Sequence, residues 1–313
     1  MDKINIGIIG LGGVGGFYGG LLAHHFEADS RINIHFVARG VHGAKIKDAG
    51  ITVRSKDTVV VGKPTQVVES VEALGTMDYI LLCTKEYDLD DVIVDLKRIV
   101  SKNTVILPLL NGVEAFEKLT EHLQAEVWQG CTYMVSRLKE AGVIDNPSGR
   151  QKIVFGRTDK ITQRMLDLDQ LFKAAGITSI CTQEIAREVW EKYILVSSSA
   201  VATAFYNCSF GVVMRDHPKE IHALVTEAAE IARAKGVSVA ADVVEVIMQR
   251  LQAIPFDSTT SMHSDFISNK VKTELDVMAA YFIREGRRLH VDVPTYQNMY
   301  SALKDKQGKY TAE

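Results

Sequence analysis

The first half of the chain alternates short apolar runs with segments of helical periodicity. Strands are predicted at 4–10, 32–38, 51–55, 58–62, 79–84 and 104–110, and helices at 15–27, 41–49 and 89–100. Nearly continuous runs of Val, Ile and Leu separated by helices are typical of a parallel sheet that is covered on both faces. The pattern therefore predicts an α/β domain with a doubly wound parallel sheet.

The pattern changes in the second half of the chain. Strands at 126–136, 152–156 and 177–182, with a helix near 161–175, are expected to complete the sheet. From Glu184 onward only helical periodicity remains, at 184–206, 218–235, 240–253, 274–289 and 295–306. We predict two domains: residues 1–182, which are α/β, and residues 183–313, which are all-helical.

Composition narrows the class of protein. The 313 residues are 46% hydrophobic and 24% charged, which is typical of a globular protein with substantial cores. The net charge of -3 gives no basic surface for nucleic acid or an anionic membrane. The four cysteines form no CxxC pair, which favours a reduced, cytoplasmic setting over disulfides. The histidines show no metal-ligand spacing, so we expect no metal.

Two uncharged stretches raise the possibility of a membrane segment. Residues 4–23 contain GxxxG spacings (Gly12, Gly16, Gly20), but their apolar density is low for a transmembrane helix. Residues 193–214 include three consecutive serines among other polar residues. We therefore expect a helix buried inside the protein and no membrane span.

The glycines near the start of the chain fit the pattern GxGxxG, directly after a predicted strand and at the start of a helix. Gly10 permits the tight turn, Gly12 lets a pyrophosphate approach the backbone, and Gly15 lets the helix pack against the strand. The alternative is a packing site for small residues. In this context the segment Gly10, Leu11, Gly12, Gly13, Val14 and Gly15 predicts a Rossmann-type dinucleotide site.

The end of the second strand indicates which dinucleotide binds. NAD sites usually have a carboxylate there, whereas this strand ends with Arg39 and Gly40. A guanidinium can bind a 2′-phosphate with paired, charged hydrogen bonds, so Arg39 favours NADP(H). The alternative is an arginine that is merely exposed.

Further polar residues follow the next two strands at the carboxyl edge of the sheet, where ligands of such folds bind. Thr84 and Lys85 are candidates for contact with the cofactor, although Lys85 also fits a solvated loop. Asn111 precedes Gly112 and fits a simple turn. Its amide, with both donor and acceptor groups, also suits a nicotinamide or a ketone oxygen.

The helical half contains one lysine in a notable position. Lys192 is the last charge before 22 uncharged residues. It fits an i,i+4 partner of Glu188, and it equally fits a partly desolvated general acid with a lowered pKa. Ser261 and Glu274 have similar alternatives, as a helix cap and as a first-turn acid.

Taken together, these motifs resemble the ketopantoate reductase (2-dehydropantoate 2-reductase) family. The resemblance spans nearly the whole chain. It is carried by GLGGVG (10–15), ARG with nearby His42, TK (84–85), LNGV (110–113), WEK (190–192), SM with Asp265, and TELD (273–276).

The resemblance implies an active site between a Rossmann domain and a helical domain, and NADPH-dependent reduction of a small 2-keto acid. Lys192 would be the general acid, and Glu274 would orient it or the substrate. Asn111 would lie near the nicotinamide and the ketone, and Ser261 would contact the substrate carboxylate.

The sequence also departs from the family pattern. The family commonly carries asparagines one and two turns after the lysine, where this chain has Val196 and Ala200, and Ser258 replaces a frequent substrate-binding asparagine. Ketopantoate reduction, which leads to pantothenate and coenzyme A, is the first expectation. Reduction of another 2-keto acid and a non-catalytic NADP-binding regulator are the alternatives. The apolar helices leave surface for a homodimer contact.

Overall fold

The computed structural model describes residues 3–309, which form two compact units. The first unit comprises the chain up to Leu110 together with Ala115–Ile185. The second comprises Asn111–Glu114 and the chain from Ala186 onward. The short segment that carries Asn111 therefore packs with the helical unit, although it directly follows a strand of the first.

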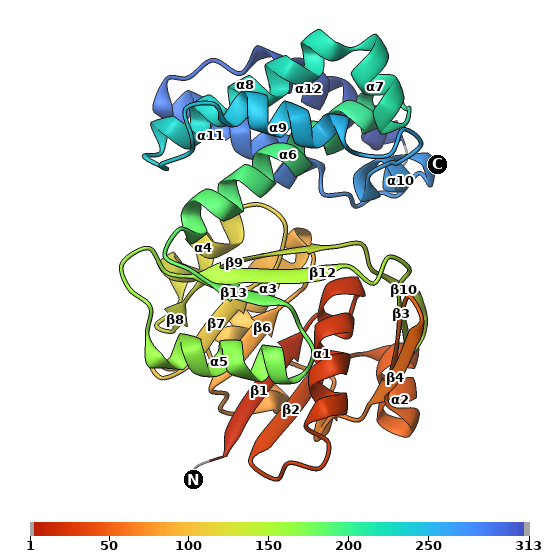
Figure 1. Ribbon diagram of the computed structural model, residues 1–313, viewed down its shortest axis with the longest axis vertical. Helices are drawn as coiled ribbons and strands as arrows, with labels where there is room; N and C mark the ends of the chain where they lie inside the picture. Colours follow the sequence, from red (N-terminus) through yellow and green to blue (C-terminus); the bar gives the residue numbers. More distant parts are fainter. Residues whose placement is uncertain (1–2, 310–313) are drawn as a thin grey trace. The chain divides into compact units, whose positions relative to one another are not determined.

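The first unit is built on a six-stranded parallel sheet in the order β5-β2-β1-β6-β7-β8. Figure 1 labels all of these strands except β5. Its strands are β1 (Ile4–Ile9), β2 (Ile32–Val37), β5 (Gln66–Val68), β6 (Tyr79–Leu82), β7 (Val105–Pro108) and β8 (Glu126–Val127). The order runs outward from β1 in both directions, so the sheet is doubly wound, as predicted. The switch point, where such sheets bind ligands, lies beside β1.

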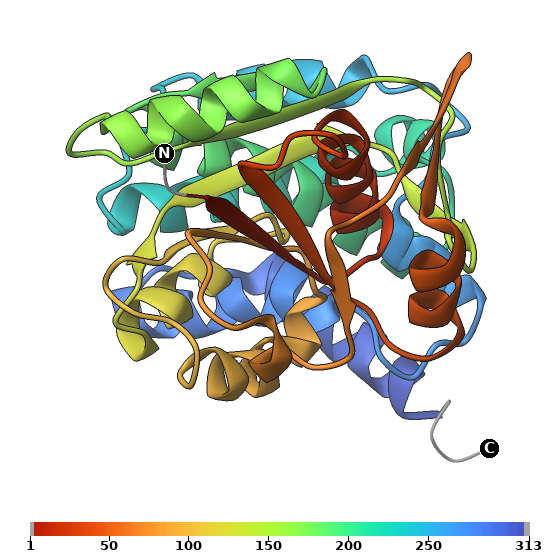
Figure 2. The same ribbon diagram turned by 90° about the horizontal axis from the view of Figure 1, so that it is seen from below.

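Helices cover both faces of this sheet because side chains alternate along each strand. Ile8 and Leu81 belong to one apolar core, and Ile9 and Leu82 belong to the other. Figure 2 shows the two layers on either side of the sheet. The helices of this unit are α1 (Gly13–His25) and α5 (Gln163–Ala174) on one face, α3 (Leu89–Leu96) and α4 (Glu114–His122) on the other, and α2 (Gly40–Ala49).

Several predicted strands lie outside the parallel sheet. Strands β3 (Ile51–Ser55) and β4 (Thr58–Gly62) pair antiparallel, because the two residues between them allow a hairpin but no crossover helix. They join a four-stranded sheet with β10 (Arg137–Glu140) and β11 (Val143–Asn146). Of the strands expected to complete the main sheet, only the start of 126–136 does so, as β8. The rest form a separate sheet, made of β9 (Gln129–Met134), β12 (Gln151–Gly156) and β13 (Ser179–Cys181).

The repeated glycines of α1 make a close helix–sheet contact. A Cβ at Gly16 would lie 2.6 Å from the Ile144 side chain, and a Cβ at Gly20 would lie 2.4 Å from that of Val53. The GxxxG spacing therefore lets α1 pack against the four-stranded sheet. Across the described residues, 3–309, none of the helices combines the length and the apolar character that crossing a bilayer requires.

The second unit is helical. Its elements are α6 (Ile185–Tyr206), α7 (Phe210–Asp216), α8 (Pro218–Ala234), α9 (Val243–Gln252), α10 (Ser261–Ile267), the π-helical turn η3 (Asp276–Ala280), α11 (Tyr281–Leu289) and α12 (Pro294–Lys309). The helix predicted at 274–289 is thus π-helical in its first part. Two of these helices, α7 and α10, were not predicted, and neither was α4 of the first unit. Each of the three is short and lacks a long apolar period.

Candidate functional site

The glycine-rich turn joins β1 to α1 and packs against the segment that follows β6. Gly10 has a φ of 93°, which only glycine adopts without strain. A Cβ at Gly10 would lie 2.6 Å from the Thr84 nitrogen, and one at Gly15 would lie 2.2 Å from the Gly10 oxygen. These two glycines are therefore required by the fold itself.

Gly12 differs from its neighbours, since a Cβ built there meets no atom within 4 Å. It precedes the first turn of α1, whose amide groups have no partner within the helix. A phosphate group can approach such amides closely only if the space beside Gly12 stays empty. The packing of the described residues therefore does not require a glycine at this position, and the open space suits the approach of a ligand.

Thr84 supplies a second sign of a binding site at this turn. Its Oγ1 atom is buried and has no hydrogen-bond partner within residues 3–309. A buried hydroxyl without a partner is costly, so a ligand or a water molecule is expected there. Lys85 follows as an exposed residue at the start of the 3₁₀ turn η2 (Glu86–Asp88). The residues around this turn therefore fit a phosphate-bearing dinucleotide.

Arg39 lies at the end of β2, as predicted, and is exposed at the N-cap of α2. Its Nε atom donates a hydrogen bond to the Glu69 carbonyl oxygen at 2.8 Å, which anchors the side chain beside the carboxyl edge of the sheet. This geometry leaves the terminal guanidinium nitrogens available for a phosphate.

His42, on α2, ties the glycine-rich turn to the hairpin of β10 and β11. The Gly142 amide donates to Nδ1 at 2.9 Å, so Nε2 carries the proton and donates to the Leu11 carbonyl at 2.9 Å. Burial lowers the pKa of His42, and its bond to Leu11 offsets this only in part. The neutral ring therefore holds the turn. Apart from the resemblance, no signal in the sequence indicated this role.

In the helical unit, two of the predicted residues are in direct contact. The Lys192 Nζ atom, near the start of α6, donates a hydrogen bond to Asn111 Oδ1 at 3.1 Å. Because Oδ1 accepts this bond, the Asn111 NH₂ group can donate to another acceptor. An ammonium and an amide donor held together can stabilise negative charge that develops on an oxygen.

Glu274 is buried, at 5% exposure, just before the π-helical turn. Its backbone carbonyl accepts a hydrogen bond from the Met278 amide at 2.9 Å. Such turns occur frequently at functional sites. A buried carboxylate on such a turn is suited to orient a neighbouring cation or a substrate hydroxyl.

Ser258 and Ser261 lie on the segment that leads into α10. Ser261 was a candidate helix cap, but the cap is Thr260, whose hydroxyl accepts from the His263 amide at 3.1 Å. Ser261 is the exposed first residue of the helix. The segment is fastened to α6 by the hydrogen bond between Thr203 and Thr260, about three turns after Lys192.

His263 completes the anchoring of this segment and was not identified from the sequence. It is buried, its Nδ1 contacts the Thr259 hydroxyl, and its Nε2 lies 3.1 Å from Asn207 Oδ1. The hydroxyl-rich run before α10 is thus held in place from two sides.

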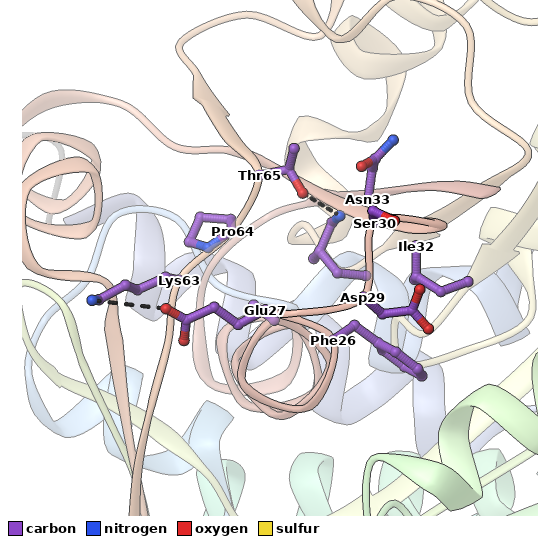
Figure 3. A pocket seen from close by; sticks show the side chains of 11 residues that line it. Phe26, Glu27, Asp29, Ser30, Ile32, Asn33, Lys63, Pro64 and Thr65 are labelled. Atoms are coloured by element: carbon purple, nitrogen blue, oxygen red, sulfur yellow. Dashed lines mark hydrogen bonds and ion pairs between the residues drawn. The ribbon is translucent and has the colours of Figure 1, made fainter. Parts of the chain in front are cut away.

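One cavity of about 260 Å³ lies elsewhere in the first unit, and Figure 3 shows its lining. The cavity is near the amino end of β2, where Lys63 pairs with Glu27 and the Thr65 hydroxyl accepts from the Ile34 amide. Ligands of parallel sheets bind at the carboxyl ends, so this cavity is separate from the glycine-rich turn.

Comparison with known proteins relates both units to one group. The family profile described as ketopantoate reductase PanE/ApbA matches residues 6–160, and its C-terminal counterpart matches residues 184–307. A solved structure of 2-dehydropantoate 2-reductase from Porphyromonas gingivalis is 32% identical, with a TM-score of 0.86, and the match covers 96% of this chain and 99% of that one.

Two curated relatives match over almost their full lengths. The uncharacterized oxidoreductase YkpB of Bacillus subtilis is 26% identical over 300 residues, which is 95% of this chain and 96% of the relative. The 2-dehydropantoate 2-reductase of Pyrococcus horikoshii is 26% identical over 307 residues, covering 97% and 98%. The two family profiles match one stretch in each unit and together cover most of the chain, and the chain therefore belongs to the ketopantoate reductase family.

Proposed function

We propose that the protein reduces a small 2-keto acid to the corresponding 2-hydroxy acid with NADPH, and that ketopantoate (2-dehydropantoate) is the substrate. Membership of the family supports the reaction class. The contact between Lys192 and Asn111 is the observation that supports their assignment to the keto group, because it holds a proton donor beside a polar amide.

The residues of the first unit would hold the cofactor. The amides of Gly12, Gly13 and the start of α1 are suited to the pyrophosphate, and Arg39 is suited to the 2′-phosphate. Thr84 and Lys85 would complete this site. NADPH, when bound, supplies the hydride that reduces the keto carbon.

Residues of the helical unit would stabilise the negative charge that develops on the keto oxygen and would donate a proton to it. As the keto carbon is reduced, negative charge grows on its oxygen, and Lys192 donates a proton to that oxygen. A cation fixed at this point stabilises the transition state more than the ground state. Asn111 positions the ketone, Glu274 orients Lys192 or the substrate, and Ser258 and Ser261 bind the substrate carboxylate.

The apolar face of α6 favours a second candidate, the reduction of a 2-keto acid that has an apolar side chain. Val196 and Ala200 follow Lys192 at intervals of one turn, and neither side chain can hydrogen-bond to a substrate hydroxyl. A site that does bind a hydroxyl rejects an analogue without it by large factors, because polar groups are then left without partners.

One assay tests both candidates. NADPH oxidation is measured with ketopantoate and with trimethylpyruvate, which is ketopantoate without its hydroxyl group. A higher kcat/KM for ketopantoate supports the first candidate, and a higher value for trimethylpyruvate supports the second. Binding of NADPH without turnover of any 2-keto acid would contradict both and favour a regulatory protein.

The variant Lys192→Ala tests the chemical step. Loss of a general acid lowers turnover by roughly 10²- to 10⁴-fold. The affinity for NADPH should stay nearly unchanged, since Lys192 is assigned to the keto oxygen and not to the nucleotide. Unaltered turnover in this variant rules the role out.

A further inference from the structure

The π-helical turn η3 is bound to α6 by two side-chain hydroxyls. The Tyr193 hydroxyl donates to the Val277 carbonyl oxygen, and Ser197 Oγ donates to the Met278 carbonyl oxygen at 2.5 Å. Tyr193 and Ser197 are four residues apart and therefore lie on the same face of α6. We call these two residues and their two carbonyl partners the η3 clamp.

The two hydroxyls donate to buried carbonyl groups of the π-helical turn. In η3 the hydrogen-bond ladder is displaced by one residue, so that the Tyr281 amide bonds to the Asp276 carbonyl, five residues back. Val277 and Met278 are buried, out of reach of bulk water. Since buried carbonyl groups need donors, the two hydroxyls stabilise this turn.

The clamp is itself anchored from behind by Tyr296 of α12. Because Ser197 donates to a carbonyl, the Tyr296 hydroxyl donates to Ser197, at 2.7 Å. Burial raises the pKa of Tyr296 far above its ordinary value, so it remains a donor. The Glu227 carboxylate accepts from the backbone amides of Thr295 and Tyr296 and fixes the start of α12.

Each member of the proposed catalytic group adjoins the clamp. Lys192 precedes Tyr193, and the carbonyl of Glu274 accepts from the amide of Met278. The turn that carries Asn111 also rests on it, since a Cβ at Gly112 would lie 3.0 Å from Val277 and 3.6 Å from the Tyr193 ring.

We propose that Tyr193 and Ser197 are positioning residues that set the separation of Lys192 and Glu274 and seat the turn that carries Asn111. The catalytic meaning of this placement rests on the proposed function, whereas the clamp itself does not. The clamp acts on geometry: a displacement of about 1 Å in a catalytic group can cost roughly 10²-fold in rate.

The consecutive serines of α6 provide a matched test. Ser197 and Ser199 are both buried, at 0% and 4% exposure, but Ser199 Oγ donates to Val196 within its own helix at 2.9 Å. Ser197→Ala and Ser199→Ala therefore remove the same atom, and only the first removes a bond to η3. Tyr193→Phe provides a second variant that lacks one clamp hydroxyl.

In the keto acid assay we expect Ser197→Ala and Tyr193→Phe to lower kcat by roughly 10- to 100-fold. KM and the Kd for NADPH should change little, and the pH profile of kcat should shift because Glu274 moves relative to Lys192. Ser199→Ala should keep wild-type kcat and pH profile. Equal losses of kcat in Ser197→Ala and Ser199→Ala would show that the serines only stabilise the helix, and would overturn the proposal.

Crystal structures of the wild type and the variants separate this proposal from the proposed function. We expect the distance between the Cα atoms of Lys192 and Glu274 to change in Ser197→Ala and to stay constant in Ser199→Ala. An unchanged distance in Ser197→Ala refutes the clamp, even if the enzyme is active. A wild type that reduces no 2-keto acid refutes the proposed function, and the crystal structures still decide the clamp.

Discussion

The glycine-rich turn permits a sharp test, because two of its glycines exist for different reasons. Gly12→Ala adds a methyl group where no atom lies within 4 Å, and the backbone there is extended (φ -76°, ψ -156°), as alanine allows. An alanine that fits its backbone stabilises a protein by about 0.4–1 kcal/mol through the unfolded state. We therefore expect the variant to fold normally, with an unchanged or slightly higher Tm.

The same methyl group should weaken cofactor binding. It occupies the space through which the pyrophosphate approaches the first amides of α1. Loss of one hydrogen bond to a charged group costs about 1.5–3 kcal/mol. This corresponds to a Kd for NADPH that is roughly 10- to 150-fold higher. Isothermal titration calorimetry measures this change, and thermal unfolding without cofactor measures the stability.

Gly15→Ala is the matched control, because it adds the same group to the same turn. Its Cβ would lie 2.2 Å from the Gly10 oxygen, so the turn must move. Overpacking of this kind destabilises proteins by about 1–3 kcal/mol or more. The stability should therefore fall in Gly15→Ala and hold in Gly12→Ala. If Gly12→Ala binds NADPH as tightly as the wild type, the pyrophosphate does not lie at this turn.

Three further predictions concern single side chains. Arg39→Asp should raise the Kd for NADPH by roughly tenfold or more, because a charged hydrogen bond is lost, and should barely change the Kd for NADH. Equal changes in the two Kd values would refute the 2′-phosphate assignment. Protonation of His42 Nδ1 would remove the acceptor of the Gly142 amide and loosen the glycine-rich turn. Because burial lowers the pKa of His42, NADPH affinity should fall only at a pH below the ordinary histidine pKa of about 6.5. His42→Gln keeps one acceptor and one donor and should remove that part of the pH dependence. The affinity for NADH is measured as well, because the 2′-phosphate of NADPH itself titrates. Identical pH profiles of wild type and variant would refute the role of His42. Gly112→Ala and Gly236→Ala both place alanine at a positive φ, at a cost of about 1–2 kcal/mol each in thermal unfolding. Only Gly112→Ala should also lower keto acid turnover, because its Cβ meets Val277 whereas that of Gly236 meets nothing; equal turnover in the two variants would contradict this.

The parallel sheet and the glycine-rich turn could be predicted because their signals are local. Buried parallel strands are continuous apolar runs, and GxGxxG directly follows one of them. The sheet membership of β3 and β4 was predicted incorrectly, although the two residues between them already require a hairpin. The separate sheet of β9, β12 and β13 could not be predicted, because an apolar strand does not reveal its partners.

The chemical groups of the proposed site can be read from residue types alone: main chain without a side chain at Gly12, a guanidinium at Arg39, and an ammonium at Lys192. The contacts that hold these groups became visible only in the folded chain. The tertiary structure placed Asn111 in the helical unit against Lys192, and it bound η3 to α6 through Tyr193 and Ser197. These residues lie far apart in the chain, so a single sequence does not show that they are in contact. Their contacts form because buried polar groups need hydrogen-bond partners once water is excluded.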